Sequence, residues 1–249
     1  MDYKRTFNNI SDIGSLMLQC GGEVYRVEES LEKLAIAYGF KDVSIFAIPY
    51  YFNITVVLPD HSVLTLSRRV RENRTNLDRL FELNSLIRQL CIEPIDNIAL
   101  ESKIASIHQI KVRQKLVFIG YGLTSGAFTG FFGGGITEII CGTIIGFGLY
   151  FVIWLFEILE VNSVVSTLLS SMYLALFGII IHRLGWIENL DATTIGVLMC
   201  LVPGVAITNS LRDLIGGEYV SGLARMLQAI LIATSIALGV GTIHIILGG

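Results

Sequence analysis

Residues 136–159 read ITEIICGTIIGFGLYFVIWLFEIL, and this stretch decides the class of protein. Only Glu138 and Glu157 carry a formal charge in it, and both lie near its ends. A helix needs about 20 mostly apolar residues to cross roughly 30 Å of hydrocarbon. The stretch therefore predicts a transmembrane helix.

Four more segments on either side have the same character. They are residues 116–132, 163–181, 192–211 and 219–247. The whole chain is 53% hydrophobic and 16% charged with a mean hydropathy of +0.66, whereas soluble proteins are roughly 25% charged. We therefore predict an all-α membrane bundle of about five transmembrane helices over residues 113–249, in contact with the lipid bilayer.

The first part of the chain has a different composition. Only Arg183, Arg212 and Arg225, of 18 Lys and Arg residues, follow Lys115. On the order of 100 residues of ordinary soluble composition can bury a core of their own. We expect residues 1–112 to form a separate α+β domain, with two helices, three strands over residues 43–48, 51–58 and 63–66, and two more helices.

Charge and motif content restrict the function and predict the topology. Basic residues at 111, 113 and 115 precede the first membrane segment, and basic residues are retained on the cytoplasmic side. The residues after Met1 are polar and do not resemble a signal peptide, so we expect a cytoplasmic N-terminal domain and an external C-terminus. The four scattered cysteines predict neither disulfide nor metal site, and we expect no cofactor, no nucleic acid and no catalytic triad.

Small residues recur along the first two membrane segments. They are Gly122, Gly126, Gly130, Gly142 and Gly146. Such spacing lets helix backbones approach closely in a membrane. Tight packing within or between subunits is one interpretation, and a lining that leaves room for substrate is the other.

The fourth membrane segment contains the proline of the membrane half, Pro203, followed by Gly204. A break here would expose backbone N–H groups that suit an anionic ligand, and Thr208 and Asn209 would add polar groups nearby. The alternative is an ordinary proline kink.

Three charged residues of the membrane half need an explanation. Asp213 and Arg225 flank the last connection and are expected to pair, as a structural salt bridge or as a gate. Glu138 could bind a proton or a substrate amine, or it could simply be solvated near the interface.

The N-terminal domain offers Glu23, Arg26 and Glu28 around the start of its second helix. Acidic residues suit a helix N-terminus, so capping would explain the glutamates without a site. The arginines at 68, 69, 71 and 74 either form a solvated face or attract anionic substrate and lipid headgroups.

Several of these motifs together resemble the bacterial threonine/serine exporter family. They are residues 21–29 (GGEVYRVEE), residues 202–204 (VPG), Thr208-Asn209, Arg212-Asp213, Gly217 and residues 221–225 (SGLAR). The resemblance covers both halves of the chain in order. It implies export of small amino acids by a secondary-active transporter of the inner membrane, with dicarboxylates such as succinate as the alternative substrates.

The resemblance also implies a partner. Full-length members carry a second block of about five helices, and split members supply it as a second small membrane subunit. We therefore expect half of a two-component transporter that assembles into an oligomer. A membrane-anchored enzyme with its site in the N-terminal domain, and an assembly protein that transports nothing, remain competing hypotheses.

Overall fold

The computed structural model describes residues 2–70 and 75–247, so Arg71 and Arg74 of the arginine run lie outside the described residues. Contacts divide the chain into two compact units. The N-terminal unit comprises residues 1–112 with 216–221, and the membrane unit comprises residues 113–215 with 222–249. Each unit is described by itself.

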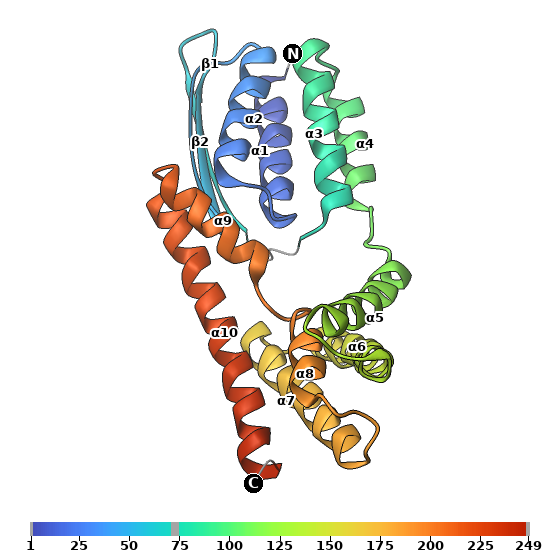
Figure 1. Ribbon diagram of the computed structural model, residues 1–249. Coiled ribbons are helices and arrows are strands. Elements are labelled where there is room, and N and C mark those ends of the chain that lie inside the picture. The colour runs from blue at the N-terminus through green and yellow to red at the C-terminus, as the bar shows by residue number, and fades with distance from the viewer. Residues whose placement is uncertain (1, 71–74, 248–249) are drawn as a thin grey trace. The chain divides into compact units, whose positions relative to one another are not determined.

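The N-terminal unit has three layers. Its elements are α1 (Tyr3–Gln19), α2 (Val24–Ala37), β1 (Lys41–Ile48), β2 (Tyr51–Val57), β3 (Val63–Arg69), α3 (Leu77–Ile92) and α4 (Asn97–His108). Figure 1 shows α1 and α2 between the sheet and the α3/α4 pair. The order of these elements is the one predicted from the sequence.

The sheet is an antiparallel meander in the order β1-β2-β3. Side chains alternate between the faces of a strand, and Phe52, Ile54 and Val56 of β2 are fully buried on the face that the helices cover. The opposite face is polar: Asn53 donates a hydrogen bond to Ser67 at 2.9 Å. This alternation fixes the register, because a slip by one residue would expose the apolar set.

Apolar stripes from all four helices complete the core of this unit. The fully buried members include Ile10, Ile13, Val27, Leu31, Leu34, Leu83 and Leu100. On α2 the buried residues recur at steps of three and four, as expected for one face of a 3.6-residue helix. The opposite side of α2 is polar and faces away from the core.

The membrane unit is entirely helical over its described residues. Its helices are α5 (Gln114–Phe131), α6 (Ile136–Ile158), α7 (Ser163–Arg183), α8 (Leu190–Leu198), α9 (Gly204–Ile215) and α10 (Tyr219–Leu247), although residues 219–221 of α10 belong to the N-terminal unit. Three of the described helices, α6, α7 and α10, are long and apolar enough to span a membrane.

The segment predicted over residues 192–211 is interrupted close to Pro203, which is one of the two alternatives considered for this proline. That segment forms two short helices, α8 and α9, with an interruption between them. The helix α5 has 18 residues but is not among the apolar spans, since Gln114, Lys115 and several glycines lower its hydropathy. Helix length and composition therefore identify three candidate spans among the described helices.

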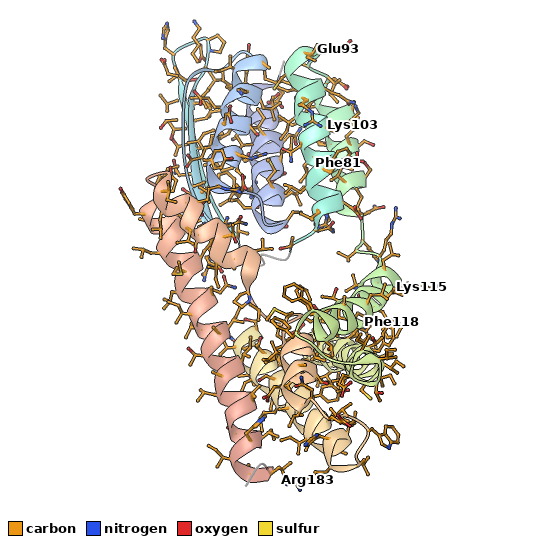
Figure 2. All side chains as sticks on the ribbon, viewed as in Figure 1. Phe81, Glu93, Lys103, Lys115, Phe118 and Arg183 are labelled. Atoms are coloured by element: carbon orange, nitrogen blue, oxygen red, sulfur yellow. The ribbon has the colours of Figure 1, made fainter. Side chains whose placement is uncertain are left out.

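A tight hairpin joins α5 to α6. Gly133 has a φ of +86°, and the amide of Gly134 donates to the carbonyl of Thr129 at 3.0 Å, which is the left-handed glycine stop of many helices. At the other end of the hairpin, Phe118 of α5, which Figure 2 labels, packs against α6. Its ring stacks on that of Phe147 with centroids 4.6 Å apart. These contacts hold α5 and α6 side by side along their length.

Candidate functional site

The interruption between α8 and α9 is a break rather than a kink. The helix α8 ends at Leu198. Beyond it the amides of Cys200 and Leu201 bond back only three residues, at 3.1 and 2.8 Å, and the amide of Val202 makes the last bond to this helix, to the carbonyl of Leu198 at 3.1 Å. Proline has no N–H and disfavours helical backbone in the residue before it. At the end of the break the amide of Gly204 donates to the carbonyl of Val202 at 2.9 Å, and regular bonding resumes when Ile207 donates to Pro203.

The start of α9 leaves backbone amides available. Within the described part of the chain, the amides of Val205 and Ala206 have no backbone acceptor. Thr208 uses its hydroxyl to bond the carbonyl of Gly204 at 3.0 Å. The positive end of the helix dipole and free N–H groups together favour an anion at this position.

A groove lies beside the break. Its lining consists of Val117, Gly120, Tyr121 and Thr124 of α5 and Cys200 of the break, and its volume is about 340 Å³. The groove therefore presents hydroxyl and thiol groups from a helix and a broken segment far apart in sequence. We call it the break groove.

Hydrogen bonds fix the broken segment against α5. The Cys200 thiol lies 3.2 Å from the Ser125 hydroxyl, and it also contacts the carbonyl of Tyr121 at 3.7 Å. Ser125 is fully buried. The sequence reasoning missed Tyr121, Thr124 and Cys200, although the small-residue stripe on the same helix indicated a close neighbour.

Glycines bring α5, α6 and α8 to close approach. A Cβ at Gly126 or Gly142 would overlap the hydroxyl of a threonine on the facing helix, and one at Gly146 would overlap Ser125. A Cβ at Gly196 of α8 would lie 2.5 Å from the amide nitrogen of Thr129. The remaining two stripe glycines also face α6, where Gly122 abuts Phe147 and Gly130 abuts Ile139.

Glu138 is not solvated, contrary to one of the two accounts given for it. Its side chain is buried, with a residue exposure of 7%. One carboxylate oxygen accepts the backbone amides of Glu188 at 2.9 Å and Asn189 at 3.3 Å. Since Asn189 is the N-cap of α8, Glu138 anchors the start of α8 to α6.

Asp213 and Arg225 form an ion pair in the membrane unit. Arg225 Nε lies 3.4 Å from Asp213 Oδ2, and the two side chains are 11% and 2% exposed. The buried face of α9 also carries Ser210, which contacts Met226 of α10 through its hydroxyl. The pair thus ties α9 to α10.

The polar residues of α9 do not all lie together. Ser210 and Asp213 are buried, whereas Thr208 is exposed and Asn209 is half-buried. The Asp213–Arg225 pair joins α9 to α10, whereas the break groove is lined by residues of α5 and by Cys200. The sequence candidates therefore fall into two groups within one unit.

The structure gives Glu28 a contact that differs from capping. Its carboxylate accepts the backbone amide of Ala47 in β1 at 2.6 Å, so it fastens α2 to the sheet. Burial raises the pKa of the Glu28 carboxyl, and the hydrogen bond from Ala47 opposes that shift.

Glu23 and Arg26 pair with each other at the start of α2. Glu23 occupies the N-cap position but makes no side-chain capping hydrogen bond. Arg26 Nε lies 2.7 Å from Glu23 Oε2. The hydroxyl of Tyr25 accepts from the same guanidinium at 2.9 Å, and these two partners raise the pKa of Arg26.

The sequence was compared with family models, curated proteins and solved structures. Residues 9–247 match the model of the family described as "Putative threonine/serine exporter". The chain belongs to this family. No curated protein and no solved structure matched. Membership of the threonine/serine exporter family, together with α6, α7 and α10, makes the chain a membrane protein of a transporter family.

Family membership confirms the resemblance that the motifs suggested. The match spans both units, so the α+β unit belongs to the exporter family as much as the helical one does. Within the described residues, no group of three His, Cys, Asp or Glu residues is placed to hold a metal ion.

Proposed function

We propose that the chain is a subunit of a secondary-active exporter whose substrate, threonine or serine, binds at the interruption between α8 and α9. The observation that carries the proposal is the break groove. It combines a discontinuous helix with hydroxyl and thiol groups in an otherwise apolar unit. Discontinuous helices are used in transporters to present backbone groups to substrates and ions.

The chemistry of the groove suits a zwitterion. The unpaired amides at the start of α9 follow Cys200 in the chain and lie outside the groove lining. They are proposed to meet the substrate carboxylate at the end of the groove, since they carry partial positive charge. The hydroxyls of Tyr121 and Thr124 would accept from the ammonium group or pair with the substrate hydroxyl. A neutral lining avoids the cost of a fixed charge inside the membrane.

The Asp213–Arg225 pair is proposed to lie on the cytoplasmic side of this path. The basic residues at 111, 113 and 115 support an orientation with the N-terminal unit in the cytoplasm and the C-terminus outside. A buried ion pair that joins α9 to α10 is suited to a gate, because breaking it would free α9 to move.

A second small membrane subunit is proposed to complete the path, and the five segments are proposed to form one half of it. The resemblance implies such a partner. In support, only 17% of the most apolar stretch of α10 is buried within the chain. Its exposed apolar residues include Leu223, Leu227 and Leu231. Either lipid or a partner helix would cover this face.

Inside-out membrane vesicles provide the test. Vesicles with the chain and its partner should accumulate labelled threonine or serine when an ion gradient is applied, and vesicles lacking the chain should not. Accumulation of succinate in place of both amino acids would establish the dicarboxylate alternative. The proposal fails if the chain changes the flux of none of these substrates.

Variants of the groove locate the site. Thr124→Val preserves shape and removes one hydroxyl, so the KM for threonine should rise about tenfold, the worth of one hydrogen bond of roughly 1.4 kcal/mol. Leu123→Val is the control, because Leu123 is 63% exposed on the same helix. Equal KM values for the two variants would show that the substrate does not bind in the break groove.

A further inference from the structure

A second groove lies in the N-terminal unit, between α2 and α3. Its volume is about 580 Å³, and it is lined by Tyr25, Arg26, Glu29, Ser30 and Lys33 of α2 and by Asn84, Ile87, Arg88, Cys91 and Ile92 of α3. These residues recur at helical spacing on each helix. The α2 side of the groove is polar, whereas the α3 side combines Asn84 and Arg88 with apolar residues. We call it the α2/α3 groove.

The groove carries an excess of positive charge. Arg26, Lys33 and Arg88 stand against the single carboxylate of Glu29. Lys33 is paired with Glu29 at 2.6 Å, and Arg26 is paired with Glu23 at 2.7 Å. One cation, Arg88, remains.

Arg88 is exposed and makes no hydrogen bond or ion pair with the part of the chain that the structure describes. A guanidinium binds a carboxylate through two parallel hydrogen bonds. The local charge balance therefore favours a ligand with one carboxylate at Arg88.

Uncharged polar groups lie in the same groove. The side-chain N–H of Asn84 donates a hydrogen bond to the carbonyl of Leu80 at 2.9 Å. The side-chain oxygen of Asn84 remains available as an acceptor. The Ser30 hydroxyl is half-buried in the lining. Both oxygens suit the ammonium group of an α-amino acid whose carboxylate is held by Arg88.

We propose that the α2/α3 groove is a second binding site for the substrate, which it holds by pairing the substrate carboxylate with Arg88 and the ammonium group with Asn84 and Ser30. The inference rests on the proposed function for the identity of the ligand. It places a site in the N-terminal unit, where the sequence had pointed to Glu23, Arg26 and Glu28, and of these three Arg26 lines the groove.

A native cysteine thiol in the lining can report on ligand binding at this site. Cys91 lines the α2/α3 groove and Cys200 lines the break groove, and both are half-buried. Cys20 and Cys141 are buried. Alkylation of the full-length chain in detergent by a maleimide, followed by peptide mass spectrometry, gives the labelling rate of each thiol separately. All rates are compared at one pH, because burial raises the pKa of Cys91.

Threonine or serine at millimolar concentration should slow labelling of Cys91 at least fivefold. In Arg88→Gln, the concentration that gives half-protection should rise about tenfold, as expected for loss of a charged hydrogen bond. Lys103→Gln is the matched control, since Lys103 is an exposed cation of α4 outside the groove, and it should behave like the native chain.

The outcomes separate this inference from the proposed function. Protection of Cys91 by neither amino acid, or equal protection in Arg88→Gln and the native chain, overturns the inference. Protection by succinate alone overturns the assignment of an amino acid to the groove. Protection of Cys200 and the vesicle flux test the exporter proposal independently of Cys91.

Discussion

Replacement of Arg225 by methionine tests the Asp213–Arg225 pair. The change keeps most of the length of the side chain and leaves the carboxylate of Asp213, 2% exposed, without its arginine. Removing one partner of a buried ion pair costs about 3–5 kcal/mol. The Nε–Oδ2 distance of 3.4 Å exceeds that of the strongest charged hydrogen bonds, so we expect about 3 kcal/mol.

Thermal unfolding of the full chain in detergent measures this loss. For a chain of this length, 1 kcal/mol corresponds to roughly 2–4 °C, so Arg225→Met should lower the Tm by about 6–12 °C. Adding Asp213→Asn removes the second charge and should restore about 2 kcal/mol of the loss. Lys115→Met is the control, because Lys115 is exposed.

Two results would refute this reasoning. One is a Tm shift in Arg225→Met no larger than that in Lys115→Met, and the other is a double variant whose shift equals the sum of the single shifts. Flux in vesicles then distinguishes the two interpretations of the pair. A structural salt bridge predicts that the double variant recovers transport with stability, whereas a gate predicts recovery of stability alone.

Three further predictions concern single contacts. Glu138→Ala leaves two backbone amides at the start of α8 unpaired, so the free energy of unfolding should fall by about 2–4 kcal/mol, and a Tm equal to that of the native chain would contradict the anchoring role. Gly196→Ala places a Cβ 2.5 Å from the backbone of α5 and should lower the Tm by several degrees, while Gly241→Ala, with open space around the new Cβ, serves as the control. The raised pKa of Glu28 means that the folded state holds its proton to higher pH than the unfolded state, so the free energy of unfolding should fall as pH rises from the unfolded pKa through the folded one. Glu28→Gln should flatten that part of a stability–pH curve measured by urea unfolding, and an unchanged slope would count against the assignment.

The sequence predicts the N-terminal elements well because their apolar residues follow helical and strand periods. It ends the third strand at residue 66, whereas β3 continues to Arg69. Ser67 and Arg69 point to the open face, and pairing with Asn53 and Tyr51 of the central strand holds them in the sheet. The sequence pattern of a single strand does not reveal these pairings with the neighbouring strand.

The membrane site shows where pattern reasoning ends. Hydropathy averaged over residues 192–211 suggests one span, and Pro203 indicates that something interrupts it. Where α8 stops, at Leu198, follows from the tertiary contacts of Cys200 with α5. Glu138 is similar, since its partners lie about 50 residues further along the chain.

The close packing of α8 on α5 and the break after α8 depend on each other. Because Gly196 has no side chain, α8 approaches the backbone of α5 at Thr129, and the chain then reaches Ser125 and Tyr121 through Cys200. The break groove lies at Cys200, four residues after Gly196. We therefore expect a bulky residue at Gly196 to change the groove by displacing Cys200 from Ser125, even though Gly196 does not line it.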